Sequence, residues 1–309
     1  KISGAEVAIK NCTFKLDSTA PEAQWGVIGG LAVSKEDSGG GASRGVAEVA
    51  HSKVTIAGGN YSVPDGGDIT VAGGAAYAQT LDINSTATVT DSEASVTGGS
   101  FTAQTKLYGG RAETETEKRS EASALRNKRT FTTGDTVTEL YGGYAYARPT
   151  KTSISLQANE NHLTLKAGAN DYVAGGYARG TQMASGTLVP KSTAVTNENE
   201  VTIEAGSGTF QKDVYGGSND LTLVKATDGI TTANSNKLHT RRGRRRRMPS
   251  RGLSRRIPSR SRTARRARSW AAMCGWVRRT ARQTSERRRI TSRSRMSRAI
   301  RTPRCTART

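Results

Sequence analysis

Cysteine, histidine and aromatic residues are scarce in this sequence. Its 309 residues include three Cys, three His and only 5% aromatic side chains. The cysteines, Cys12, Cys274 and Cys305, are too few and too widely spaced for a disulfide framework or a metal site. None of the histidines stands near Cys, Asp or Glu at the spacing of metal ligands. We therefore expect no metal and no cofactor.

Long hydrophobic runs are absent as well. No stretch is long enough to form a transmembrane helix, and no apolar run of the kind found in signal peptides occurs near Lys1, which stands where a start Met is expected. We interpret the chain as an interior fragment, with its export signal and its membrane anchor outside the given sequence.

Excess positive charge is absent from most of the chain, although the net charge is +21. Residues 1–240 contain 21 Lys and Arg against 25 Asp and Glu, a net charge of −4. Residues 241–309 contain 26 Arg, no Lys and a single acid, Glu286, a net charge of +25. All nine Tyr and 31 of the 34 Gly lie before the switch. Two kinds of polypeptide are therefore joined near Thr240, and we expect 1–240 and 241–309 to be separate units.

The arginine-rich tail, 241–309, has two interpretations. As a basic arm it would be disordered and would bind nucleic acid and other polyanions without sequence preference, because arginine neutralises phosphate. The polyanion contacts would begin at a cluster of six residues: Arg241, Arg242, Arg244, Arg245, Arg246 and Arg247. Alternatively, the tail is an out-of-frame translation of further repeats, since Tyr-Gly-Gly codons read one base early yield triplets such as Val277-Arg278-Arg279. The coding DNA after Leu238 distinguishes the two.

Internal repetition dominates residues 1–240. A Gly-Gly pair after an apolar or aromatic residue recurs six times, with its first glycine at 29, 73, 109, 142, 175 and 216, a period of 33 to 44. A second phrase precedes several of these pairs, as in VTIAGGNY at 54–61 and VTGGSF at 96–101. A third phrase begins with asparagine, as in NENHLTL at 159–165 and NENEVTI at 197–203. Such ordered phrases are not typical of a disordered linker.

Each phrase has the pattern of a short strand and a turn. Val-Thr-Ile alternates apolar and polar residues, and glycine permits positive-φ corners. Short strands and corners make coils, which bury their apolar faces by stacking. We therefore predict an all-β solenoid in which matching asparagines form amide ladders. We also expect the Gly-Gly pairs to be positive-φ corners, and one period to cover one and a half to two coils.

These repeats resemble the passenger domains of bacterial autotransporters and related adhesin-like surface proteins. The resemblance covers 1–240 and rests on phrases of the type N-x-V-T-I-x-G-G-x-F followed by Y-G-G-Y-A. It implies a right-handed parallel β-helix, exported through the outer membrane and either displayed at the cell surface or secreted. It also implies contact with a host or neighbouring-cell surface protein or glycan. The family's C-terminal β-barrel has no counterpart in the sequence, since nothing after Thr240 alternates over strands of that length.

Residues that could support catalysis are few. His162 occupies the repeat position that Glu200 fills in the next repeat, which indicates a solvated site. Asp65 and Asp68, in PDGGD, fit a turn more simply than a calcium or carboxylate pair. The Gly-Gly pairs lack the context of phosphate-binding loops. We therefore predict no catalytic residues.

The tyrosines beside the glycine pairs are the candidate ligand contacts. They are Tyr108, Tyr141, Tyr144, Tyr177 and Tyr215. They form either an aromatic ridge that touches a sugar or protein ligand or a set of packed corners. The function predicted is a non-enzymatic structural or adhesive solenoid. The alternatives are a nucleic-acid-binding protein that uses the tail and a β-helix enzyme that processes polysaccharides.

Overall fold

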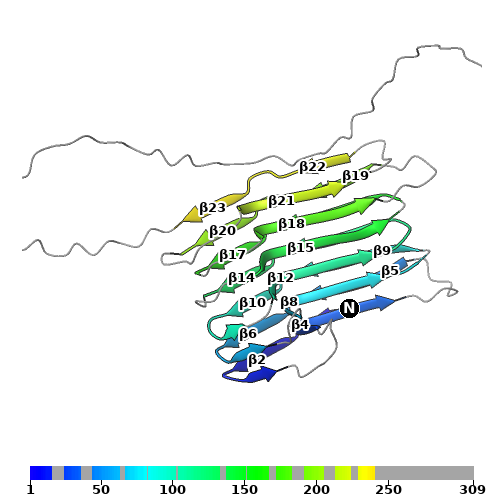
Figure 1. Cartoon of the computed structure of the whole chain (residues 1–309). Helices are drawn as coiled ribbons and strands as arrows, with labels where there is room; N and C mark the ends of the chain where they lie inside the picture. Colours follow the sequence, from blue (N-terminus) through cyan, green and yellow to red (C-terminus); the bar gives the residue numbers. More distant parts are fainter. Residues whose placement is uncertain are drawn as a thin grey trace, which may run out of the picture. The chain divides into compact units, whose positions relative to one another are not determined.

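The computed structural model describes twelve segments of the first 240 residues: 1–15, 24–35, 44–62, 67–81, 83–101, 104–132, 137–150, 152–166, 172–182, 191–204, 213–223 and 229–240. They contain 23 strands and no helix (Figure 1). Every strand pairing in them is parallel, and the strands stack into a β-solenoid, which confirms the fold predicted from the repeats. The predicted tail, 241–309, lies outside the described residues.

The strands form four sheets, which we call A to D in the order in which the chain visits them. Sheet A consists of β1 (Ile2–Ser3), β5 (Arg44–Ala50), β9 (Asn84–Thr90), β13 (Ser120–Leu125), β16 (Ile154–Asn159), β19 (Ser192–Val195) and β22 (Gly229–Thr232). Sheet B consists of β2 (Glu6–Lys10), β6 (Lys53–Ala57), β10 (Glu93–Val96), β14 (Lys128–Phe131), β17 (His162–Leu165), β20 (Glu200–Ile203) and β23 (Lys237–Thr240).

The other two sheets differ greatly in size. Sheet C is short and consists of β3 (Thr13–Lys15), β7 (Asn60–Ser62) and β11 (Ser100–Phe101). Sheet D holds the longest strands: β4 (Gln24–Lys35), β8 (Asp68–Gln79), β12 (Gln104–Glu115), β15 (Glu139–Thr150), β18 (Val173–Gln182) and β21 (Val214–Thr222). Each Gly-Gly pair lies within one of these six strands.

One sequence period makes one coil. The second glycines of successive pairs are direct neighbours in sheet D, since Gly110 pairs with Gly74 on one side and with Gly143 on the other. The expectation of one and a half to two coils per period was therefore wrong. The sequence pattern could not show this, because it does not reveal that a single coil includes a strand as long as those of sheet D.

The corner between sheets A and B carries a left-handed residue in every coil. Six non-glycine residues there have φ between 51° and 57°, and Gly4 holds the same position in the first coil with φ 71°; the six are His51, Asp91, Arg126, Glu160, Glu198 and Ser235. Asp and His tolerate this conformation better than most other residues, and the long side chains of Arg126, Glu160 and Glu198 are exposed. The next residue turns inward. In four consecutive coils it is a buried or half-buried asparagine.

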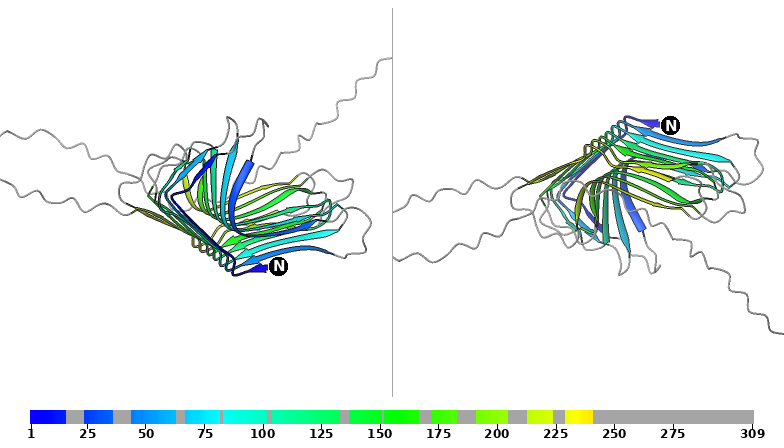
Figure 2. Two further views of the ribbon diagram at one scale, coloured as in Figure 1. Left: turned by 90° about the horizontal axis from the view of Figure 1, so that it is seen from below. Right: turned by 90° about the horizontal axis from the view of Figure 1, so that it is seen from above.

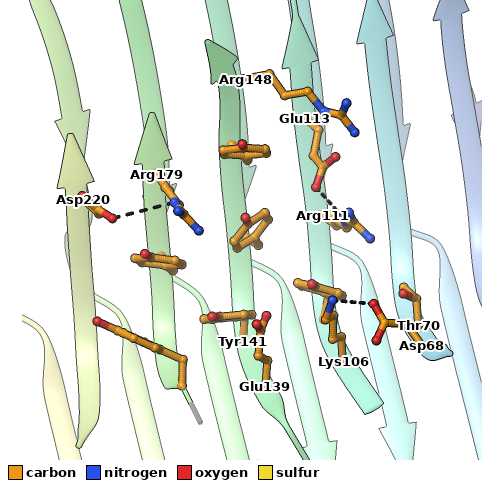
Figure 3. Close-up of a pocket in the computed structure, with 15 residues that line it drawn as sticks. Asp68, Thr70, Lys106, Arg111, Glu113, Glu139, Tyr141, Arg148, Arg179 and Asp220 are labelled. Carbon is orange, nitrogen blue, oxygen red and sulfur yellow. Dashed lines mark hydrogen bonds and ion pairs between the residues drawn. The ribbon is translucent and has the colours of Figure 1, made fainter. Parts of the chain in front are cut away.

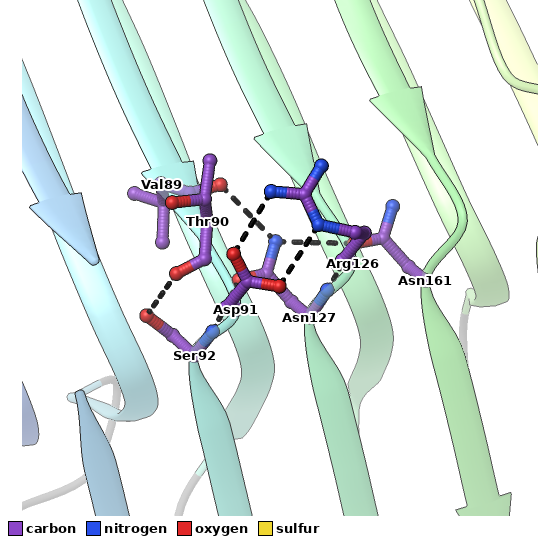
Figure 4. A network of polar contacts seen from close by, with 7 residues as sticks. All are labelled: Val89, Thr90, Asp91, Ser92, Arg126, Asn127 and Asn161. Atoms are coloured by element: carbon purple, nitrogen blue, oxygen red, sulfur yellow. Dashed lines mark hydrogen bonds and ion pairs between the residues drawn. The ribbon is translucent and has the colours of Figure 1, made fainter. Parts of the chain in front are cut away.

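These inward asparagines form the predicted amide ladder. The Nδ2 group of each donates to the Oδ1 of the next, at 3.1 Å from Asn127 to Asn161, 3.0 Å from Asn161 to Asn199 and 2.9 Å from Asn199 to Asn236. Each Oδ1 also accepts from the backbone N–H of the residue one coil below, as Asn161 does from Asn127 at 2.9 Å (Figure 4). Because unpaired buried amides are costly, this ladder fixes the vertical register of the coils.

The Gly-Gly pairs are not the corners that we expected. No glycine of these pairs is among the positive-φ residues, whereas Gly58, Gly59 and Gly99 are, and these three belong to the second phrase. The pairs lie inside the strands, where sheet D passes directly over the inward residues of the A–B corner, which are serine beneath Gly30 and Gly74 and asparagine beneath the later pairs. A Cβ on Gly142 would overlap the carbonyl oxygen of Gly175, and a Cβ on Gly143 would overlap the side chain of Asn161. Close backbone approach, rather than φ, is what demands glycine here.

This close approach divides the interior into two cores and bends sheet D. One core lies between sheets B and D and includes Ile56 and Leu107, and the other is rich in alanine and lies between sheets A and D. In β12, every second side chain points inward as far as Leu107, and the alternation starts again at Ala112. The two glycines between these residues, Gly109 and Gly110, therefore both face the A–B corner. Figure 2, viewed along the stack, shows the strands of sheet D bent in the middle. The outer face of sheet D is consequently concave.

Candidate functional site

A groove of about 560 Å³ follows the concave outer face of sheet D. We call it the sheet-D groove. Its walls come from strands β8, β12, β15, β18 and β21, together with Tyr172 just before β18 (Figure 3). The aromatic lining consists of Tyr108, Tyr141, Tyr144, Tyr146, Tyr172 and Tyr177. The charged lining consists of Lys106, Arg111, Arg148, Arg179, Asp68, Glu113, Glu139 and Asp220. A single face thus gathers aromatic, acidic and basic groups from five coils.

Register places the tyrosines in columns along the stack. Tyr108 pairs with Tyr141, directly before the glycines, and Tyr144 pairs with Tyr177, directly after them. The ring centroids of Tyr108 and Tyr141 lie 5.6 Å apart, and those of Tyr141 and Tyr177 lie 5.3 Å apart, with nearly parallel planes. Tyr144 contacts all three at 5.2 to 5.7 Å. The rings therefore stabilise one another as well as line the groove.

The five tyrosines singled out from the sequence differ in exposure. Tyr108 and Tyr141 are each 2% exposed and Tyr177 is 6% exposed, so these three are mainly packing residues. Tyr144 and Tyr215 are half-buried and reachable by a ligand. Tyr215 contacts Tyr172 at 5.9 Å, at the end of the same aromatic cluster. The five tyrosines therefore do lie in one aromatic cluster, in which packing applies to Tyr108, Tyr141 and Tyr177; ligand contact stays a prediction for Tyr144 and Tyr215.

Three half-buried tyrosines next to this set escaped the sequence analysis. Tyr77 and Tyr146 lie two residues beyond the column of Tyr144, and Tyr172 lies two residues before the column of Ala174. Only Tyr residues next to the glycine pairs were singled out. Counting outward from each pair in steps of two would have found the others, because alternate residues of a strand share a face.

Ion pairs hold the charged side chains of the groove. Nε of Arg111 donates to Glu113 at 2.6 Å, and Nζ of Lys106 donates to Asp68 at 2.6 Å. The guanidinium of Arg111 also lies over the rings of Tyr108 and Tyr77, at 5.1 and 5.4 Å. At the rim, Arg148 lies 3.3 Å from Glu115, and Arg179 lies 3.7 Å from Asp220. Since both rim arginines are about half exposed, at 50% and 51%, they can exchange these partners for a ligand.

Burial raises the pKa of the groove phenols. Desolvation is the main cause, and it moves the pKa of Tyr108, Tyr141, Tyr144 and Tyr177 well above the ordinary value of 10.0. All four hydroxyls therefore keep their protons at neutral pH, and half-buried Tyr144 is the one of the four that a ligand can reach.

These phenols should make the solenoid sensitive to alkali. Above about pH 10 the unfolded chain releases phenol protons that the folded chain retains, so the contribution of these tyrosines to the free energy of unfolding should be constant below pH 10 and fall as the pH rises above it. Denaturant titrations at several pH values would measure the fall, and tyrosinate absorbance of the folded protein should show late-titrating groups. As the pH rises above 10, the free energy of unfolding of a Tyr141→Phe variant should fall less than that of the wild type. If every tyrosine of the folded protein titrated near pH 10, the packing described here would be wrong.

Other residues weighed from the sequence lie apart from the groove or outside the described residues. His162 is exposed and pairs in register with Glu200, as expected. His51 is an exposed corner residue, and His239 lies in β23. Asp68 faces the groove, whereas Asp65 lies outside the described residues. The tail cluster Arg241, Arg242, Arg244, Arg245, Arg246 and Arg247 also lies outside them.

The described segments lack two features that would point to other functions. They hold no group of three or more His, Cys, Asp or Glu side chains arranged to bind a metal ion. Within the same segments, no helix has the length and apolar character needed to cross a membrane.

Comparison with known proteins found no match. No family model fits the chain, and neither the curated proteins nor the solved structures contain a significant match. Function must therefore be inferred from the groove and the repeats themselves.

Proposed function

We propose that this chain is a non-enzymatic adhesive β-solenoid, displayed at a bacterial cell surface or secreted, which contacts a host or neighbouring cell through the sheet-D groove. The groove is the observation that carries the proposal. Aromatic side chains with accessible rings and exposed rim arginines are the residue types that dominate binding surfaces. The resemblance of the repeats to autotransporter passengers supports the surface location.

The rigidity of the fold also suits attachment. The groove residues stand on strands of a continuous parallel sheet, and the ladder of Asn127, Asn161, Asn199 and Asn236 holds those strands in register. A binding surface on such strands loses little conformational entropy when it meets its ligand. No conformational change is needed to form it.

The test is attachment of beads coated with the full chain to cell monolayers. A Tyr146→Ala/Arg179→Ala variant removes two groove side chains that contact each other, with the guanidinium 6.0 Å from the ring centroid. We expect attachment to drop at least about fivefold, as for the loss of binding hot spots. Arg126→Ala, which breaks an exposed Arg–Asp pair at the A–B corner, is the matched control and should attach normally.

Salt concentration separates this proposal from nucleic-acid binding by the tail. Attachment through a groove of balanced charge should persist at raised salt, whereas attachment through an arginine-rich arm should weaken steeply. If the groove variant and the wild type attached equally well, and raised salt abolished the attachment of both, the adhesive proposal would be rejected in favour of the basic arm.

Polysaccharide processing is the second candidate. The observation in its favour is that four carboxylates, Asp68, Glu113, Glu139 and Asp220, line a single groove. Three of them are held in ion pairs by Lys106, Arg111 and Arg179. Release of reducing ends from a polysaccharide by the purified chain would favour the enzyme over the adhesin.

A further inference from the structure

The charges that line the sheet-D groove balance. Four basic and four acidic side chains face it, and neighbouring members of opposite sign are paired, as Arg111 is with Glu113 and Lys106 with Asp68. An anionic ligand would meet the carboxylates, and a cationic ligand would meet the guanidinium groups. The lining therefore favours a ligand with no net charge that can both donate and accept hydrogen bonds.

The aromatic lining adds a second requirement. Tyr144, Tyr146 and Tyr172 are half-buried, so parts of their rings remain open to the groove. A sugar ring carries apolar C–H groups on its faces and hydroxyls around its rim. It can therefore pack on tyrosine while its hydroxyls bond to phenols, carboxylates and guanidinium groups.

The extent of the groove sets the shape of the ligand. Its lining runs from Asp68 in β8 to Asp220 in β21, across five neighbouring strands. Since parallel strands lie about 4.8 Å apart, the lined stretch is roughly 19 Å long. The coil-to-coil repetition of tyrosines along it matches a ligand that is itself extended and repetitive.

We infer that the sheet-D groove binds a neutral, unbranched polysaccharide that lies along the solenoid axis, across the strands of sheet D. This inference rests on the proposed adhesive function and names the class of its ligand. Tyr144 and Tyr146 support the sugar rings, and Arg148 and Arg179 bond to hydroxyl oxygens at the rim. Glu113 and Asp220 accept hydrogen bonds from sugar hydroxyls.

Two other ligands fit the lining less well. A polyanion such as nucleic acid requires an excess of positive charge, which the groove lacks. A proline-rich peptide docks on aromatic grooves through its rings and its carbonyl oxygens. Because proline has no N–H group, such a peptide has too few donors for the four carboxylates.

The experiment is direct titration of the full chain with neutral linear oligosaccharides. Calorimetry with cello-, xylo-, manno- and malto-hexaose would identify the preferred backbone. These probes carry no net charge, so the arginine-rich tail does not attract them. We expect one of them to bind, and Tyr146→Ala and Arg179→Ala each to weaken its affinity about tenfold. Arg126→Ala, the matched control at the A–B corner, should leave the affinity unchanged.

Folding of each variant is checked by its circular dichroism and its denaturation midpoint. Tyr146→Phe provides a second measurement, because it keeps the ring and removes only the hydroxyl, and it should retain most of the affinity. If none of the neutral oligosaccharides binds, or if binding is equal in the groove variants and the wild type, the inference is overturned.

The outcome is separable from that of the adhesive proposal. Attachment of coated beads that depends on the groove but is abolished by protease treatment of the target cells would leave the adhesive proposal standing. The ligand would then be a protein, and only the inference of a polysaccharide ligand would be rejected. Attachment that survives protease and is inhibited by the free oligosaccharide would support both.

Discussion

Replacing Gly142 with valine should unfold or severely destabilise the solenoid. A Cβ at this position would overlap the carbonyl oxygen of Gly175 in the next coil and would lie 3.2 Å from the Cβ of Asn161. Neither obstacle is the free end of a flexible side chain, since one is backbone and the other belongs to the ladder. We expect the free energy of unfolding to fall by at least about 3 kcal/mol, at the upper end for overpacked cores.

Glu115→Val is the matched control for this substitution. It introduces the same β-branched residue at the end of the neighbouring strand, β12, where the side chain is 41% exposed and contacts Arg148. It should change stability by less than about 1 kcal/mol. Denaturant unfolding of the two variants measures the difference. Equal midpoints would show that sheet D does not approach the ladder as closely as described.

Replacing Arg129 with leucine should have the opposite effect and stabilise the protein. Arg129 is 1% exposed, and none of its three guanidinium nitrogens has a hydrogen-bond partner. Its inward neighbours in register are Ala94 and Leu163, and its guanidinium lies 5.8 Å from the ring of Phe131. An uncompensated buried charge is costly, and even the replacement of a buried ion pair by apolar residues is often neutral or stabilises a protein by about 1–4 kcal/mol. We expect a gain of about 2–4 kcal/mol for Arg129→Leu.

The effect of Arg129 should depend on pH. Desolvation lowers the pKa of its guanidinium to about 9. In the unfolded chain the group keeps its proton at higher pH, so between the two pKa values the unfolded state binds the additional proton. The wild type therefore gains stability relative to Arg129→Leu as the pH rises above 9, and the gap between them should be largest below pH 9 and narrow above it.

Paired denaturation curves of the two proteins cancel the opposing effect of the tyrosines, which both share. Arg126→Leu is the control, since Arg126 is exposed and paired with Asp91 at 2.8 Å. It should not stabilise the fold. If Arg129→Leu proved less stable than the wild type at neutral pH, the guanidinium would have a partner in solution, and its burial without one would be disproved.

The groove is the part of the site that the sequence revealed only incompletely. Tyr108, Tyr141, Tyr144, Tyr177 and Tyr215 stood out because each adjoins a glycine pair. Tyr146 and Tyr172 do not adjoin a pair, and only the alternation of residues along each strand would have placed them on the same face. Nothing in the sequence indicated that this face, which also carries charged residues such as Arg111 and Glu113, is concave.

The sequence by itself determined the solenoid, the span of its repeats and the asparagine ladder. The alternation in Val-Thr-Ile and the regular recurrence of asparagine are patterns of residue spacing, which can be recognised in the sequence without knowledge of the fold. The tertiary structure alone decided that one period is one coil and why the glycine pairs are needed. Neither Gly142 nor Gly143 has a positive φ, and only the approach of Gly175 and Asn161 from other coils excludes a side chain there. That approach bends sheet D and makes its outer face a groove, which no single repeat encodes.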